Sequence, residues 1–229
     1  MLPLKDNVPT RSFPLVTWGL IGANFAVWAW ELSAPATRVD HYAYYPCAVQ
    51  GPCLGPEASH HLPAAESALS SMFMHASWLH ILGNMLFLWI FGNNVEDALG
   101  RVRFLLWYLV AGLVATATQT FVTLHYAGAA AASVPNLGAS GAIAGVLGAY
   151  LLLLPTARVW TFVGFLILPL PAFLFLGVWF VLELWEAGFA VTHPAAGGGV
   201  AFFAHVGGFL FGAATVYLVA KRPPLRAYR

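Results

Sequence analysis

The chain has 229 residues, of which 60% are hydrophobic and only 8% are charged. This composition excludes an ordinary soluble protein and indicates a polytopic membrane protein, with residues 1–229 as a single domain. A formal net charge of +1 argues against a nucleic-acid partner. We expect no cofactor.

The first predicted element is a membrane-spanning helix at residues 14–32, which follows a short polar leader at residues 1–12. The apolar run from Phe13 to Trp30 is close to the roughly 20 residues that a helix needs to cross a bilayer. A long loop at residues 33–77 comes next and is rich in Pro, Gly, His and aromatic residues. Such a composition suits the membrane interface, so we expect part of this loop to lie in the membrane surface.

Both cysteines of the chain, Cys47 and Cys53, lie in the long loop. They can form a disulfide if the loop faces an oxidising compartment, and they remain thiols if it does not. A metal site with the nearby His41, His60 and His61 is a further alternative. The spacing C-x5-C followed by HH fits no standard zinc pattern, so we expect no metal.

Five more helices are predicted, at residues 78–93, 104–124, 140–154, 171–188 and 201–220. The segments between them include a charged turn at 93–103, a small-residue loop at 125–139 and a Gly-rich loop at 192–200, and a basic tail follows at 221–229. Residues 159–168 form a surface-lying or re-entrant connector in this prediction. The alternative is one kinked helix that begins at Trp160.

The helix at residues 140–154 is too short to cross a membrane. Its 15 residues span about 22 Å, whereas the hydrocarbon core of a bilayer is about 30 Å thick. One end must therefore lie below the membrane surface. The non-helical segment that leads to it has to be covered by protein or by a water-filled cavity.

Basic residues predict the orientation. Six spans put both termini on the same side, together with nine of the ten lysines and arginines. These nine are Lys5, Arg11, Arg101, Arg103, Arg158, Lys221, Arg222, Arg226 and Arg229. Arg38 alone lies on the other side, so the positive-inside rule predicts cytosolic termini and an outward-facing long loop.

Polar residues within the predicted helices gather at the outer membrane face. His80 and Asn84 lie in the first turns of one helix, Ser140 begins the short helix and His205 lies about four residues into the last helix. Polar groups are costly inside a membrane unless they pair or line a wet cavity. This cluster is therefore a candidate site.

Small residues predict which helices touch. Gly141, Gly145 and Gly148 are spaced along the short helix at i, i+4 and i+7, and Ala204, Gly208 and Gly212 along the last helix at i, i+4 and i+8. Faces of this kind permit close approach of two backbones. Packing them together would bring Ser140 beside His205.

A serine beside a histidine suggests nucleophilic chemistry, because an imidazole can take the proton of the hydroxyl. A third, acidic member would normally orient the histidine. Glu183 and Glu186 are the only near candidates, and we expect a Ser–His dyad in which packing orients the ring. His80 and Asn84 share one helix face and could hold an oxyanion with the Ser140 N–H, or could simply bond to loop backbone.

Three motifs resemble those of the rhomboid proteases. Residues 73–84, FMHASWLHILGN, resemble the motif of the second helix, GASG at 138–141 the nucleophile motif, and AHVGG at 204–208 with Gly212 the histidine motif. The turn with Glu96, Gly100 and Arg101 also matches. The resemblance implies an all-α, six-transmembrane-helix bundle of the prokaryotic type, in a cytoplasmic membrane.

By this resemblance the chain is an intramembrane serine protease that cleaves transmembrane segments of other proteins near the outer leaflet. Ser140 would be the nucleophile, His205 the general base, and His80, Asn84 and the Ser140 N–H the oxyanion hole. Gly138 and Gly141 would shape the nucleophile turn. Trp179 and Phe180 would belong to a gate formed by the fifth helix.

Two other functions compete with this hypothesis. A rhomboid-like scaffold would bind membrane helices without cutting them, but such a protein could lose Ser140 or His205, and this chain keeps both. A transporter would also place polar residues inside the membrane. Here they gather at one leaflet and no inverted repeat is visible. The physiological substrate and the oligomeric state stay open.

Overall fold

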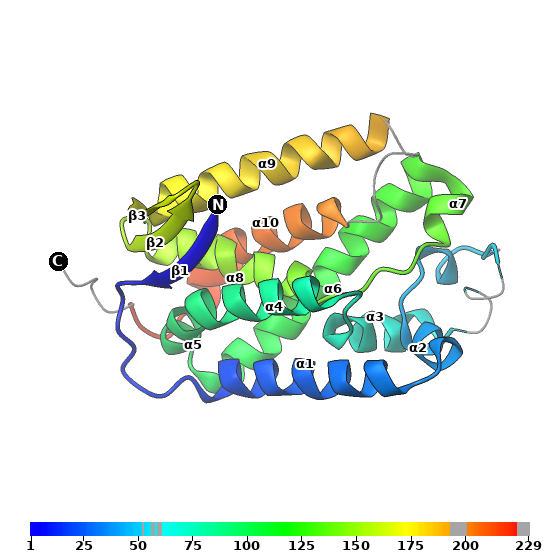
Figure 1. The fold of residues 1–229 in the computed structure, drawn as a ribbon, viewed down its shortest axis with the longest axis horizontal. Coiled ribbons are helices and arrows are strands. Elements are labelled where there is room, and N and C mark those ends of the chain that lie inside the picture. Colours follow the sequence, from blue (N-terminus) through cyan, green and yellow to red (C-terminus); the bar gives the residue numbers. More distant parts are fainter. Residues whose placement is uncertain (52, 56–57, 59–60, 193–200, 224–229) are drawn as a thin grey trace.

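The structure is a computed structural model that describes residues 1–51, 53–55, 58, 61–192 and 201–223. Its longer helices lie roughly side by side, with β1 (Leu2–Asp6) and the C-terminal end of α10 at the same end of the bundle (Figure 1). They are α1 (Leu15–Ser33), α4 (Trp78–Phe87), α6 (Arg101–Val122), α8 (Ser140–Leu153), α9 (Ala172–Thr192) and α10 (Phe202–Val219). His60, most of the predicted Gly-rich loop and residues 224–229 of the predicted tail lie outside the described residues.

The predicted long loop contains short helices. These are α2 (Ala36–Tyr42), α3 (Ala64–Ser70) and two single turns of 3-10 helix at Pro46–Ala48 and Ser71–Phe73. Cys47 and Cys53 form a disulfide within it. Of the alternatives left open for these cysteines, the disulfide is therefore the one that the structure contains, and neither sulfur is available as a thiolate ligand.

The predicted charged turn at residues 93–103 is wrong for most of its length. The helix that begins with α4 continues through a π-helical turn, Leu88–Gly92, into α5 (Asn93–Leu99), and the chain turns only at Gly100, whose φ is +79°. Glu96 is buried here and accepts hydrogen bonds from the backbone N–H groups of Val16 and Thr17. A carboxylate with partners from a distant helix can remain inside a helical segment.

The predicted loop at residues 125–139 is also partly helical. After α6 the chain continues through a π-helical turn, Thr123–Ala127, and then α7 (Gly128–Ala132). The four consecutive alanines of α7 have high helix propensity, which outweighs the small-residue, loop-like appearance of the segment. The extended segment before α8 is therefore shorter than predicted.

A small antiparallel sheet is the main departure from the predicted all-α fold. It consists of β1 (Leu2–Asp6), β2 (Arg158–Val163) and β3 (Leu166–Pro171), in that order. The predicted leader thus contributes a strand. The predicted connector at 159–168 is part of a β-hairpin, and the alternative of a kinked helix that begins at Trp160 is wrong, because Trp160 lies in β2. An apolar run of this length cannot be assigned to helix or strand by periodicity alone.

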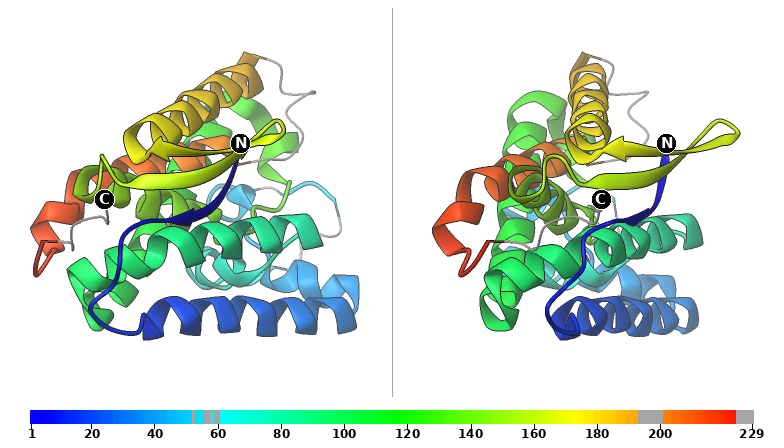
Figure 2. Two further views of the ribbon diagram at one scale, coloured as in Figure 1. Left: turned by 60° about the vertical axis from the view of Figure 1, so that its left-hand side comes forward. Right: turned by 90° about the vertical axis from the view of Figure 1, so that its left-hand side faces the viewer.

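The prolines of the sheet lie in β1 and β3, which are its edge strands, where a missing N–H need not cost a ladder bond. The sheet bridges two parts of the bundle, since β1 contacts α4 whereas β2 and β3 contact α9. Figure 2 shows the strands lying between these two helices. β3 leads directly into α9, so the sheet holds the beginning of that helix.

The lengths and compositions of the described helices do not confirm the six predicted membrane spans. Among the described residues, three helical segments are long and apolar enough to cross a membrane, at Arg101–Ala132, Ala172–Ala190 and Phe202–Val219. A fourth span results if Ala64–Phe73 and Trp78–Leu99, which meet at an 83° bend, count as one. The count of six stays a prediction. α8, with 14 residues, is a shorter apolar helix, close to the predicted bounds.

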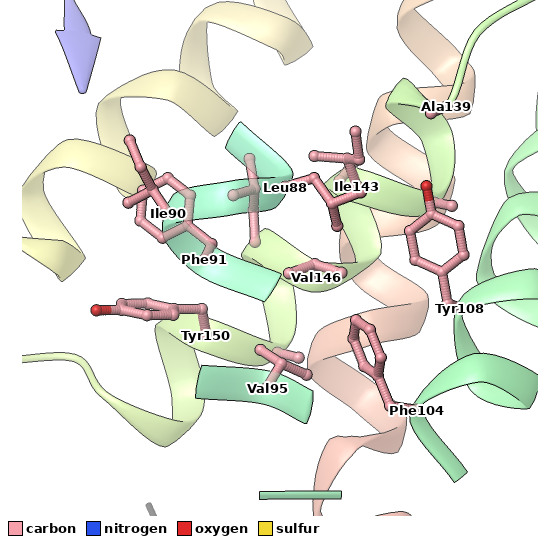
Figure 3. Packing of buried hydrophobic residues seen from close by; sticks show 14 of the residues in the cluster. Leu88, Ile90, Phe91, Val95, Phe104, Tyr108, Ala139, Ile143, Val146 and Tyr150 are labelled. Carbon is pink, nitrogen blue, oxygen red and sulfur yellow. The ribbon is translucent and has the colours of Figure 1, made fainter. Parts of the chain in front are cut away.

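α8 is the central helix of the bundle, and it packs against α4, α5, α6, α9 and α10. Its middle, from Gly141 to Tyr150, is buried throughout. Figure 3 shows Ile143, Val146 and Tyr150 of α8 packed among apolar side chains of the neighbouring helices, including Phe91 and Phe104. Any side chain at the first residue of α8 is therefore held by a rigid element.

Candidate active site

The turn that leads into α8 places Ser140 against the side chains of α4. Gly138 has a φ of +125°, a conformation that favours glycine. A Cβ at this position would come within 2.8 Å of the His80 ring and 3.6 Å of Asn84 Nδ2. Position 138 thus requires glycine for two reasons: its backbone conformation and the close approach of the His80 ring.

Ser140 and His205 are within hydrogen-bond distance of each other. The distance between Ser140 Oγ and His205 Nε2 is 2.8 Å. Ser140 is the first residue of α8, and His205 lies in the first turn of α10. The Gln119 side chain accepts hydrogen bonds from two N–H groups of that same turn, those of Phe203 and Ala204, which fixes the beginning of α10.

Close packing of α8 on α10 produces this pairing. A Cβ at Gly208 would overlap the carbonyl oxygen of Gly141, and a Cβ at Gly212 would overlap that of Gly145. A Cβ at Gly148 would likewise overlap the carbonyl oxygen of Phe209. Glycine at these positions lets the two backbones touch, which sets the separation of the serine from the histidine.

The other nitrogen of His205 has an acidic partner. His205 Nδ1 lies 2.7 Å from Glu183 Oε2, and both side chains are largely buried. Glu183 belongs to α9, the helix that also carries Trp179 and Phe180. The expectation that packing alone orients the ring is therefore wrong, because a carboxylate lies on the side of the imidazole away from Ser140.

His80 and Asn84 lie beside Ser140, each with a partner of its own. His80 Nδ1 accepts a hydrogen bond from the Ala76 N–H at 3.4 Å, which leaves the Nε2 edge of the ring facing Gly138. Asn84 Nδ2 lies 3.0 Å from His75 Nε2. His80 therefore does both things that were given as alternatives: it bonds to loop backbone through Nδ1, and its Nε2 edge lies beside the turn that carries the serine.

A cavity of about 450 Å³ opens over these side chains. The polar residues that line it include His80, Asn84, Asn136, Ser140, Glu183 and His205. Its remaining lining is mostly apolar, as is usual for a binding site with a few convergent polar groups. The cavity is large enough for a short segment of polypeptide next to the serine.

The aromatic residues predicted as a gate pack onto the histidine helix. The Trp179 ring lies 6.1 Å from the His205 ring and 5.9 Å from Phe209, measured between centroids. Phe180 stacks on Phe209 at 4.3 Å. Both residues thus join α9 to α10 next to the cavity. A role in gating stays a prediction.

Two residues of the site were not assigned from the sequence. Glu183 was considered as a third member but set aside; its position four residues after Trp179, on the same helix face, was the available signal. His75 was quoted only as part of a motif, yet it pairs with Asn84, and its N–H donates to the buried Glu31 carboxylate of α1. No local sequence pattern connects residues 31 and 75.

Fold and site together define a helical membrane protein with a serine–histidine pair at a cavity, an arrangement suited to acyl transfer. The Rhomboid domain family matches residues 65–222, more than half of the chain. The chain therefore belongs to the rhomboid family, which is a family of intramembrane serine proteases.

Three relatives illustrate the range of the similarity. Rhomboid protein 1, mitochondrial, of Saccharomyces cerevisiae is 31% identical over 157 residues, 68% of this chain and 42% of the relative. Rhomboid-like protein 11, chloroplastic, of Arabidopsis thaliana is 30% identical over 169 residues, 72% and 56% of the two chains. Presenilin-associated rhomboid-like protein A, mitochondrial, of Danio rerio is 37% identical over 103 residues, 45% and 25%.

These relatives overturn one prediction. The expected location, a prokaryotic cytoplasmic membrane with cytosolic termini, disagrees with their names, which are mitochondrial or chloroplastic. The resemblance gave the family but not the membrane, and the positive-inside rule reports only an asymmetry of charge. The chain spans between a quarter and just over half of the length of these relatives.

Proposed function

We propose that this chain is an intramembrane serine endopeptidase that cleaves transmembrane segments of other membrane proteins. The observation that carries the proposal is the 2.8 Å separation of Ser140 Oγ and His205 Nε2 at the wall of a cavity. An unprotonated imidazole nitrogen at this distance can accept the proton of a serine hydroxyl. Membership of the rhomboid family supports the same reaction class.

In this mechanism Ser140 Oγ attacks the carbonyl carbon of the scissile peptide bond, and its proton passes to His205 Nε2. The tetrahedral intermediate then collapses, and His205 returns the proton to the departing amine nitrogen. Water hydrolyses the resulting ester of Ser140, with His205 again serving first as base and then as acid. No cofactor takes part in any of these steps.

The oxyanion of the tetrahedral intermediate needs donors beside Ser140. We assign this role to the Ser140 N–H, the His80 Nε2–H and the Asn84 side chain. The first N–H groups of a helix have no intrahelical acceptor, and the helix dipole adds positive potential there. The 2.8 Å approach of the His80 ring to the Cβ position of Gly138 supports its share in this role. Gly138 and Gly141 serve the turn by leaving room for these donors.

The substrate would be a transmembrane helix that unwinds locally, because an intact helix hides its carbonyl groups in i→i+4 hydrogen bonds. It would reach Ser140 past Trp179 and Phe180 of α9, which act as a gate in this proposal. Residues 1–229 would form one membrane domain, with residues 33–77 on the face of the bilayer nearest the site. From the relatives, we place the domain in an organellar membrane.

Labelling with a fluorophosphonate serine probe tests the proposal. The protein is purified in detergent as wild type, Ser140→Ala and His205→Ala. The wild type should react covalently, and both variants should lose the reaction while keeping the wild-type melting temperature. Cleavage of single-span substrates in lipid vesicles should follow the same order. A folded wild-type protein that is not labelled and does not cleave would contradict the proposed protease function and favour a scaffold that binds membrane helices.

A further inference from the structure

An acidic side chain inside a membrane-spanning helix calls for an explanation. α9 contains a candidate span at Ala172–Ala190, and Glu183 lies within it. Around Glu183 the helix is apolar and largely exposed to the surroundings of the protein, as at Val181, 63% exposed, and Trp185, 73% exposed. Ionisable residues in such positions are costly and as a rule serve a function.

Glu183 is directed at one partner. Its Oε2 lies 2.7 Å from His205 Nδ1, and the two side chains are 15% and 14% exposed. Among the described residues that line the cavity, it is the only carboxylate. A hydrogen bond to a charged group is strong in such a place, because little water competes for it.

With Glu183 ionised, the contact selects which nitrogen of His205 carries the proton. A carboxylate can only accept, so Nδ1 must be the donor in this pair. A neutral imidazole has one N–H, and the other nitrogen then presents a lone pair. That nitrogen is Nε2, which lies 2.8 Å from Ser140 Oγ.

From this geometry we propose that Glu183 is the positioning residue of the site, the third member of a Ser140–His205–Glu183 triad. The inference rests on the proposed function and deepens it. Glu183 holds the tautomer in which Nε2 can accept a proton, and its charge stabilises the imidazolium that forms when it does. Its hydrogen bond is to His205 and not to Ser140, so it acts on the serine through the histidine.

The same helix provides a second restraint on the ring. Trp179, one turn before Glu183, packs against His205 at 6.1 Å between centroids. α9 thus packs against His205 and also supplies its hydrogen-bond acceptor. The triad is complete only while α9 lies against α10.

Steady-state kinetics of Glu183→Gln and Glu183→Asp test the proposal, with Glu186→Gln as the matched control. Glu186 lies on the same helix and is exposed. We expect Glu183→Gln to lower kcat roughly 10- to 100-fold with KM changed less than about twofold, because His205 acts in the transition state and not in substrate binding. Probe labelling should slow in parallel. Glu183→Asp should recover part of the loss, and Glu186→Gln should match the wild type.

A spectroscopic measurement separates positioning from a merely structural role. In protein with ¹⁵N-labelled histidine, the signal of His205, assigned by its loss in His205→Ala, should report protonation at Nδ1. In Glu183→Gln the population should shift toward the Nε2–H form. Wild-type kcat in Glu183→Gln, or an unchanged tautomer, overturns this inference alone. If the wild type and Ser140→Ala are equally unreactive, the proposed function itself has failed.

Discussion

The two ends of the bundle use polar residues in opposite ways. At the end where β1 and the end of α10 lie, which we call the terminal end, Asp97 pairs with Arg11 at 2.7 Å and with Arg222 at 3.5 Å. Glu96 beside it accepts three hydrogen bonds from the start of α1, two of them from Thr17. These groups are directed at one another, and among the described residues none lines the cavity.

At the other end, the cavity end, polar groups are directed at the cavity. Ser140, His80, Asn84, His205 and Glu183 all line it, and His205 is hydrogen-bonded to both Ser140 and Glu183. The sequence alone presents both clusters as polar residues in an apolar chain. The comparison teaches that a polar cluster that is satisfied internally stabilises the fold, whereas one that faces a cavity is available for chemistry.

The largest effect should follow from Ser140→Ala at the cavity end. We expect cleavage to fall at least about 1,000-fold, and the double variant with His205→Ala to be no slower, because the two residues act as one unit. Thermal unfolding in detergent should not change. If the two losses multiply instead, the residues act independently and the comparison fails.

Glu96→Ala should produce the reverse result at the terminal end. It leaves three donors of Val16 and Thr17 without their acceptor, so we expect the free energy of unfolding to fall by about 3 kcal/mol. Titration of purified protein with a denaturant measures the loss. Activity per folded molecule should stay at the wild-type level, and a fall in kcat at full folding would contradict a purely stabilising role.

Gly212→Ala should affect both properties, because this residue lies where α8 and α10 touch. Its Cβ would overlap the Gly145 carbonyl oxygen and push the helices apart. We expect a loss of about 2 kcal/mol in stability and roughly 10- to 100-fold in cleavage, since His205 moves with α10. Gly22→Ala is the control, because a Cβ on Gly22 meets nothing within 4 Å. Wild-type cleavage by Gly212→Ala would exclude this packing as the basis of the site.

The smallest expected effect is a change with pH in the free energy of unfolding, caused by a carboxyl at the terminal end. Burial raises the pKa of Asp6 on β1 from 3.8 to about 6, although the Tyr150 hydroxyl donates to this carboxyl at 2.6 Å and opposes the shift. The folded protein therefore holds this proton more tightly than the unfolded chain. The contribution is fully present below about pH 3.8 and is lost as the pH rises through about 6.

The expected change in unfolding free energy between these pH values is roughly 1–2 kcal/mol. Unfolding curves of the wild type and Asp6→Asn across this range measure it, because the amide does not titrate. An equal dependence on pH in both proteins would show that another group is responsible.

Much of the site could be predicted from sequence because its rules are local. The glycine spacing of two helices was sufficient to predict that Ser140 lies near His205, and one glycine before the serine indicated the turn. Glu183 could not be assigned in the same way. Its direction depends on the rotation of α9 about its own axis, which is set by Trp179 and Phe180 packing onto α10.

The fold was less predictable where distant contacts decide local structure. Glu96 and Asp97 indicated a turn, but their partners lie some 80 residues earlier in the sequence, at Thr17 and Arg11, and allow a helix instead. The hairpin of β2 and β3 depends likewise on β1, which adds a third strand from the other end of the sequence. Propensity and periodicity contain no information about such partners.

The sheet fixes only the first residues of α9, so a small rotation of the helix about that end would displace its far part by several ångströms. β3 ends at Pro171 and α9 begins at Ala172, so the helix is fastened at one end by the strands (Figure 1). Further along, Trp179 and Glu183 of the same helix line the cavity. Glu183 is about 16 Å from the fastened end at 1.5 Å per residue. A swing of about 10° about Ala172 would carry its carboxylate about 3 Å, more than the length of its hydrogen bond to His205. If substrate enters beneath α9 as proposed, its admission and the activation of Ser140 would then exclude each other in time.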